Sequence, residues 1–227
     1  MTTTGTETGN GGRPRGLRLS RGARRAQLLE SALEVFSTHG YHAAAMDEIA
    51  DRAGVSKPVL YQHFPGKLEL YVALLDQSCD TIIDSAQRAL DSTQDNKQRV
   101  AATVDAFYDY VSSAEGAFRL VFESDLTNEP AVRARVDRVT KECAALITQV
   151  IRDDTGLPEG QARLLAVSLV GMAQVSARYW LADTDSPPNG DQHADSVGGI
   201  SRHEAATLVA GLAWRGIRGY PRTDEHG

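Results

Sequence analysis

Apolar residues recur at intervals of three and four along most of the chain, which is the period of an amphipathic helix. We find no strand-like alternation of any length, so the pattern predicts an all-α fold of about nine helices. In chain order, the expected helices cover about residues 22–39, 46–53, 57–64, 68–90, 100–111, 118–125, 130–155, 161–181 and 203–218. Gly54, Gly116 and Gly156 are expected to interrupt or end helices.

Two polar segments stand outside this helical pattern. Residues 1–12 are polar and rich in glycine, which is typical of a disordered tail. Residues 182–201 form a long polar insertion, which we expect to be a loop or a disordered segment. The sequence therefore predicts a disordered basic arm over residues 1–20, a small helical domain over 21–67 and a larger helical domain over 68–220.

The segment 40–71 carries the most specific pattern in the chain. Residues 46–53 place their apolar side chains on one helical face, and Gly54 follows where a helix often ends in a left-handed residue. Pro58 suits the first turn of a second helix, because a missing N–H costs little there. The residue before a proline avoids helical angles, so Lys57 is a candidate for the cap of that helix. Two short helices joined by a tight turn are predicted.

A helix–turn–helix places its second helix in the major groove of DNA, with that helix's N-terminal residues nearest the bases. Val59, Leu60 and Phe64 of the second helix can pack against the helices before it. The opposite side of the second helix is then free to contact DNA. Tyr61 and Lys67 suit phosphate oxygens, and such contacts fix the register of a protein on DNA. The candidate DNA-contacting residues are Arg18, Arg24, Ala45, Met46, Ser56, Lys57, Pro58, Val59, Tyr61, Gln62, His63 and Lys67.

The charge distribution supports double-stranded DNA as a partner. Six arginines lie between residues 13 and 25, where they suit an arm that contacts phosphates or enters a minor groove. The alternative is a solvated tail before an ordinary charged helix start. Residues 1–67 hold nine Lys or Arg and six Asp or Glu, a net charge of +3, whereas residues 68–227 hold 15 and 24, a net charge of −9. A basic head on an acidic body fits a DNA-reading protein.

The residues that carry a family resemblance are Phe36, Gly40, Tyr41, Ile49, Ala50, Ala53, Gly54, Val55, Ser56, Leu60, Tyr61, His63, Phe64, Lys67, Leu70 and Tyr71. As a set they resemble the TetR family of one-component bacterial regulators. The resemblance implies an all-α homodimer with an operator-binding three-helix domain and a larger helical domain that holds a small molecule. Ala45 departs from the family pattern, because members commonly carry Ser or Thr there, which caps a helix and touches a phosphate.

The remaining composition indicates a soluble cytoplasmic protein that does not associate with a membrane. Cys79 and Cys143 form no metal or redox motif and fall on apolar helix faces, so both are expected in the core. No apolar run approaches the roughly 20 residues of a membrane helix, and the N-terminus lacks the apolar segment of a signal peptide. We expect no cofactor.

The last two helices carry many small residues, which let helix backbones approach closely. Tight packing inside one chain would explain them, but the family resemblance implies that this helix pair forms the homodimer interface. Arg178 is unusual inside an apolar helix, and we expect it to pair with an acid at the interface rather than with an anionic ligand. The candidate ligand-binding residues are Phe107, Phe118, Phe122, Leu126, Cys143, Ile147, Met172, Val175, Tyr179 and Trp180. Any one of them could equally be plain core.

A finer resemblance involves the QSCD, FRLVFESD, LVGM and ARYWL stretches of the larger domain. With the head, they look most like actinobacterial TetR regulators of fatty-acid synthesis, and this implies a long-chain acyl-CoA or similar lipid as effector. The charged head of such a ligand would need basic partners. The available basic residues are Arg119, Arg133, Arg135, Arg138 and Lys141.

Three other functions compete with a lipid-responsive regulator. An enzyme is disfavoured, because the sequence shows no nucleophile–base pair, metal cluster or phosphate loop. A repressor of an efflux or catabolic operon would respond to an aromatic or drug-like compound, and a cationic drug would need buried acids among aromatic residues. Aromatic residues make up only 6% of the chain, which favours a lipid-like ligand. A module that has lost DNA binding through changes such as Ala45 is the third alternative.

Overall fold

The computed structural model describes residues 19–123, 126, 128–184 and 200–218. Within those residues the regular elements are helices, as the periodicity predicted: α1 (Arg21–Ala43), α2 (Met46–Arg52), α3 (Lys57–His63), α4 (Lys67–Asp91), α5 (Asn96–Ser113), α6 (Glu115–Phe122), α7 (Pro130–Thr155), α8 (Glu159–Thr184) and α9 (Arg202–Arg218). The expected arm, with Arg18, and most of the insertion at 182–201 lie outside the described residues.

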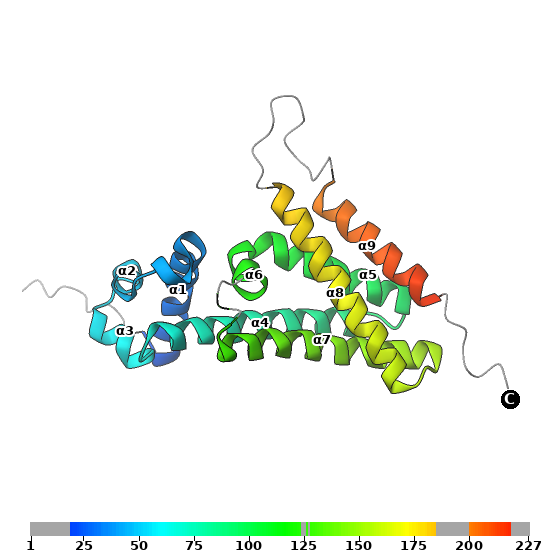
Figure 1. Cartoon of the computed structure of the whole chain (residues 1–227), viewed down its shortest axis with the longest axis horizontal. Helices are drawn as coiled ribbons and strands as arrows, with labels where there is room; N and C mark the ends of the chain where they lie inside the picture. The colour runs from blue at the N-terminus through cyan, green and yellow to red at the C-terminus, as the bar shows by residue number, and fades with distance from the viewer. Residues whose placement is uncertain (1–18, 124–125, 127, 185–199, 219–227) are drawn as a thin grey trace, which may run out of the picture.

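Helices α1 to α3 form a small head at one end of the molecule (Figure 1). Each of the three helices contributes a fully buried side chain to the core of the head, namely Leu28, Ile49 and Leu60. Gly54 adopts a φ of 62°, a left-handed angle that glycine reaches without steric cost, and it turns the chain from α2 into α3. The predicted two-helix unit is therefore present, with its apolar sides turned inward.

Helix α4 runs from the head into the body and joins the two (Figure 1). It packs on α7 along one side and on α5 along another, while α8 covers α7 and α9 covers α5. Cys79 and Cys143 are both buried with their thiols free, so the prediction that they belong to the core is confirmed. Gly156 ends α7 in a left-handed conformation with a φ of 68°, also as expected.

Helix boundaries differ from the prediction in two informative places. The chain breaks at Ala114 rather than at Gly116, so α6 starts and ends about three residues earlier than expected. Gly116 is instead a packing residue, because a Cβ there would collide with the Ser37 hydroxyl of α1. At α3 the cap is Ser56, with a φ of −75° and a ψ of 149°, and Lys57 is the first helical residue. The assignment of Lys57 as a cap was wrong.

Candidate nucleic-acid interface and ligand cavity

The outward side of α3 carries the residues expected to read DNA. Ser56, Lys57, Pro58, Tyr61 and Gln62 are all exposed at or near the start of this helix. Val59 and His63 are half-buried, and Leu60 and Phe64 are buried against the rest of the head. One side of α3 is thus used for packing, while the other offers hydroxyl, amide and ammonium groups to a partner.

Lys57 is held in place by Asp47 from the first turn of α2. Their Nζ and Oδ1 atoms are 2.7 Å apart, and both side chains are more than half exposed. The hydrogen bond to Asp47 and its charge raise the pKa of Lys57 above its ordinary value. The Lys57 ammonium stays exposed in this pair, and a DNA phosphate would compete with Asp47 for it.

The first turns of α1 are tied to the turn between α2 and α3. Arg24 donates from Nη1 to Gln27 Oε1 over 2.6 Å, and Gln27 Nε2 donates to the Ala53 carbonyl over 2.9 Å. The guanidinium of Arg25 lies 4.4 Å from the centre of the Phe64 ring. Two arginines of the basic segment are therefore fixed on the surface of the head, beside the helix–turn–helix. Their contact with DNA stays a prediction.

Met46 and Lys67, two of the predicted DNA contacts, have structural roles within the head. Met46 is only 8% exposed, so its side chain belongs to the core of the head. Ala45 is exposed and precedes α2. It provides no side-chain cap, because a methyl group cannot accept a hydrogen bond. The Lys67 ammonium donates to the carbonyls of Tyr41, His42 and Ala44 over 2.8, 3.2 and 2.9 Å. These three bonds use all its protons, and Lys67 thereby closes the end of α1.

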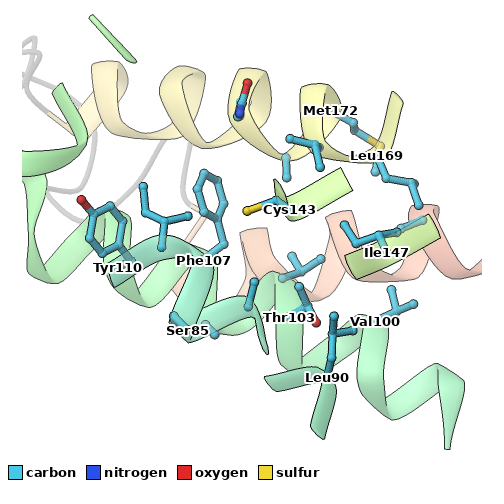
Figure 2. Close-up of a pocket in the computed structure, with 18 of the residues that line it drawn as sticks. Ser85, Leu90, Val100, Thr103, Phe107, Tyr110, Cys143, Ile147, Leu169 and Met172 are labelled. Carbon is cyan, nitrogen blue, oxygen red and sulfur yellow. The ribbon is translucent and has the colours of Figure 1, made fainter. Parts of the chain in front are cut away.

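A cavity of about 110 Å³ lies within the body, chiefly between α4, α5, α7 and α8 (Figure 2). Five of the ten predicted ligand-binding residues line it: Phe107, Phe122, Cys143, Ile147 and Met172. The remaining lining residues are Ile82, Ser85, Ala86, Leu90, Val100, Thr103, Val104, Ala106, Tyr110, Val139, Val150, Ile151, Leu169, Val170, Ala173, Gln174 and Ala213. The wall is thus apolar, with a few hydroxyl and amide groups.

The other five predicted residues lie outside the wall of this cavity, and their contact with a ligand stays a prediction. Phe118 is buried behind the wall, with its ring centre 6.2 Å from Phe107 and 5.1 Å from Phe122. Trp180 packs in the core, where its indole donates to the Ile200 carbonyl over 3.1 Å. Leu126 is partly buried outside the cavity wall. Val175 and Tyr179 are 65% and 72% exposed on the outer side of α8.

Sequence reasoning missed the contribution of α4 and of the first half of α5 to the cavity. Ile82, Ala86 and Leu90 of α4 line the cavity, and they belong to a segment that the periodicity predicted only as a helix. Because a lined cavity and a packed core use the same side chains, periodicity carries no signal that separates them.

The cavity wall stays uncharged at neutral pH. None of the lining residues in the described part of the chain is Asp, Glu, Lys, Arg or His. Burial raises the pKa of Tyr110 to about 12 and that of the Cys143 thiol to about 11. Both groups are therefore protonated at physiological pH, and the cavity suits an uncharged apolar group.

Three of the basic residues considered for a ligand's head group form ion pairs with acids of the chain, namely Arg119, Arg135 and Arg138, and Arg178 does so too. Arg178 donates from Nη2 to the Phe122 carbonyl over 3.1 Å, and its Nε lies 3.9 Å from Glu123 Oε1. Arg178 therefore has an acid of its own chain as a partner, and the expected pairing at an interface stays a prediction. Arg135 and Arg138 bridge α7 to α4, at 3.2 Å from Asp76 and 2.7 Å from Asp80.

Comparison with known proteins finds similarity to one family of bacterial regulators. The model of bacterial regulatory proteins of the tetR family matches residues 28–74. The HTH-type transcriptional activator FasR of Mycolicibacterium smegmatis is 46% identical over 213 residues, which cover 94% of this chain and 91% of FasR. A TetR-like transcriptional regulator from a Rhodococcus species superposes with a TM-score of 0.67 at 26% identity, over 89% of this chain and 100% of that one.

A third protein, known from a solved structure, shares the fold. The transcriptional regulator FadR of Bacillus subtilis, solved in complex with stearoyl-CoA, superposes with a TM-score of 0.68 at 15% identity, over 83% of this chain and 96% of that one. A helix–turn–helix head on a helical body with an internal cavity defines a DNA-binding transcriptional regulator. The chain belongs to the TetR family. Membership of a family of regulatory proteins confirms that it is not an enzyme.

Proposed function

We propose that the chain acts as a homodimer in the cytoplasm, binds operator DNA with its head, and changes that binding when a long-chain acyl-CoA or similar lipid enters the body. The observation that carries the proposal is the cavity, whose lining among the described residues is uncharged. Helix α4 lines this cavity and also joins the body to the head. A ligand that moves α4 in the cavity therefore acts on the element that carries the DNA-reading surface.

The cavity favours the alkyl chain of a lipid over a charged compound. An apolar wall gains from burying methylene groups and would leave a cation without a partner. The volume of about 110 Å³ is below the roughly 150 Å³ of a cavity that holds benzene, so a long chain requires the helices to separate. The structure of FadR in complex with stearoyl-CoA supports a long-chain acyl-CoA as a ligand for a protein of this fold.

The homodimer is proposed from an apolar face on the last two helices. Val175 and Tyr179 on α8, with Leu208 and Leu212 on α9, are each more than 60% exposed. Figure 1 shows the two helices beside each other on the outer side of the body. Contrary to the expectation from the sequence, the segment Glu159–Ala182 of α8 is long and apolar enough to cross a membrane, by length and composition only, and 22% of its most apolar window is buried. A second copy of this face would cover these residues.

The second candidate, a repressor that responds to a small aromatic or drug-like compound, is favoured by one observation. The cavity as it stands suits a small apolar molecule better than a long chain. The absence of an acid among the described lining residues argues against a cationic drug. The two candidates therefore differ in the length of apolar ligand that produces a response.

Both candidates can be separated by operator binding measured with defined ligands. We would measure fluorescence anisotropy of DNA from upstream of this protein's own gene and of neighbouring lipid genes, at fixed salt, with stearoyl-CoA, a short-chain acyl-CoA or free CoA. A change in affinity with stearoyl-CoA alone supports the lipid-responsive regulator. An operator affinity that none of the three ligands changes would favour the repressor that responds to an aromatic compound. No binding at low salt would contradict DNA recognition altogether.

Lys57→Ala and Tyr61→Ala are each expected to weaken operator binding by roughly tenfold, or about 1–2 kcal/mol. Both side chains are exposed on α3, and neither packs in the core of the head. Loss of one phosphate contact by Lys57→Ala should also lower the salt dependence of binding by about one unit of slope. Dimerisation should stay unchanged, and Lys141→Ala on the exposed side of α7 serves as the control. Unfolding by either substitution would contradict the outward placement.

Phe122→Trp is expected to weaken ligand binding by about tenfold while the ligand-free operator affinity stays near normal, because overfilling a packed site typically costs about 1–3 kcal/mol. The larger ring takes volume from the cavity that Phe122 lines. Ligand affinity and operator affinity are measured separately. Ala145→Trp adds the same ring at an exposed position of α7 and should change neither. An unaltered ligand affinity in Phe122→Trp would remove this residue from the binding site.

A further inference from the structure

Tyr110 of α5 carries an unused hydrogen-bond donor at the wall of the cavity. The residue lines the cavity and is 7% exposed. Figure 2 shows its side chain at one end of the cavity, with Val100 and Ile147 toward the other. Its hydroxyl is buried and has no hydrogen-bond partner among the described residues. Buried polar groups in proteins are nearly always paired, so a buried hydroxyl without a partner beside a cavity requires an explanation.

Two other polar residues of the cavity wall are satisfied by the chain itself. Thr103 Oγ1 donates to the Arg99 carbonyl over 2.8 Å, within α5. Gln174 Nε2 donates to Thr140 Oγ1 over 3.4 Å, between α8 and α7. Tyr110 differs from both, because the fold buries its hydroxyl and leaves it without a bond. A ligand that fills the cavity could supply the missing acceptor.

The Tyr110 hydroxyl suits a neutral oxygen rather than an anion. Burial raises the pKa of Tyr110 to about 12, so the hydroxyl keeps its proton at neutral pH. Ser78 of α4 opposes this rise in pKa from close by, without a hydrogen bond of normal length and angle to Tyr110. A carboxylate or phosphate would be buried without a counter-charge, because no lining residue in the described part of the chain is Lys, Arg or His.

We propose that the Tyr110 hydroxyl donates a hydrogen bond to the thioester carbonyl of a bound acyl-CoA, and that it thereby selects acyl thioesters over other ligands with an apolar chain. This inference rests on the proposed function. The thioester carbonyl is neutral and is joined directly to the alkyl chain, so it is the first polar group that follows the chain into an apolar cavity. Binding of this oxygen pairs a donor that is otherwise buried without a partner.

The test removes each side of the proposed hydrogen bond in turn. S-octadecyl-CoA has the chain and head of stearoyl-CoA, with a methylene group in place of the carbonyl, and Tyr110→Phe removes the hydroxyl. Tyr108→Phe is the matched control, because Tyr108 is 1% exposed and its hydroxyl donates to Ser176 Oγ over 2.9 Å. For the wild type and both variants, calorimetry measures the affinity for each ligand without DNA. Urea unfolding measures the stability of the ligand-free proteins at fixed protein concentration.

The wild type is expected to bind stearoyl-CoA about two- to tenfold more tightly than S-octadecyl-CoA, which is the range of one hydrogen bond. Tyr110→Phe should abolish this preference, and Tyr108→Phe should keep it. The urea midpoint of ligand-free Tyr110→Phe should equal or exceed that of the wild type, because the substitution removes a buried donor that has no partner. Tyr108→Phe should lower the midpoint, because it removes a paired hydroxyl.

Equal wild-type affinities for the two ligands would overturn this inference, and so would a preference that survives in Tyr110→Phe or is lost equally in Tyr108→Phe. The proposed function would still stand if stearoyl-CoA changed operator affinity. A midpoint that Tyr110→Phe lowers as much as Tyr108→Phe would also overturn the inference, because the hydroxyl would then have a partner in the ligand-free protein. A wild type that binds neither ligand would overturn the proposed function and this inference with it.

Discussion

Leu212→Glu is expected to convert the protein from a dimer to a monomer at micromolar concentration. Leu212 is 62% exposed in the single chain and lies on the apolar face that α9 shares with α8. In a two-fold dimer the same patch serves both subunits, so one substitution places two carboxylates in the interface. A central interface residue is often worth about 2 kcal/mol or more, and two copies raise the dissociation constant by roughly a thousandfold.

Sedimentation velocity over a range of protein concentrations measures this change directly. Leu19→Glu is the matched control, because Leu19 is another exposed leucine, 49% exposed, but stands before α1 in the head. The control should stay dimeric. Operator affinity of Leu212→Glu should fall as well, since a monomer reads one half-site only. A wild-type protein that sediments as a monomer, or a Leu212→Glu variant that stays dimeric, would show that this face is not the interface.

Lys67→Met is expected to lower the free energy of unfolding by about 2–3 kcal/mol. The substitution keeps the length of the stem and removes the ammonium. The carbonyls of Tyr41, His42 and Ala44 then lose their charged donor, and the Tyr41 ring loses the cation beside it. Lys67 is half-buried, so water compensates only part of this loss. The loss is a large share of the roughly 5–15 kcal/mol that holds a typical domain folded.

Urea unfolding at fixed protein concentration tests the role of Lys67, because the stability of a dimer depends on concentration. The exposed Lys141 provides the control, and Lys141→Met should change stability by less than about 0.5 kcal/mol. A simple phosphate contact, as the sequence suggested, would have the opposite signature. Stability would then be unchanged, and only the affinity for DNA would fall.

Lys67 illustrates why the sequence could not predict every role. Its position after Pro65 and Gly66, at the start of a helix, suits an anion, and that local argument predicted a phosphate contact. The carbonyls that it binds belong to residues 23 to 26 positions earlier in the chain. Their position beside Lys67 follows from how α1 packs on α4, and no local pattern records that packing.

The cavity shows the same limit on a larger scale. Met172 lines it, while Val175 and Tyr179, a turn and two turns further along α8, face outward. Helix α8 is apolar on most of its surface, so periodicity assigns no side of it to the interior. The side that faces the cavity is fixed by α5 and α7, which pack against α8 from elsewhere in the chain.

The sequence by itself determined the helices, the helix–turn–helix and the outward side of α3, because each depends on residues within a few turns of one another. Gly54 fixes the turn, and Leu60 and Phe64 fix which side of α3 is buried. Only the tertiary structure decided which apolar side chains enclose the cavity and which stay exposed on α8 and α9. Those outcomes depend on how helices distant in the chain pack together, and the same apolar residues satisfy either arrangement.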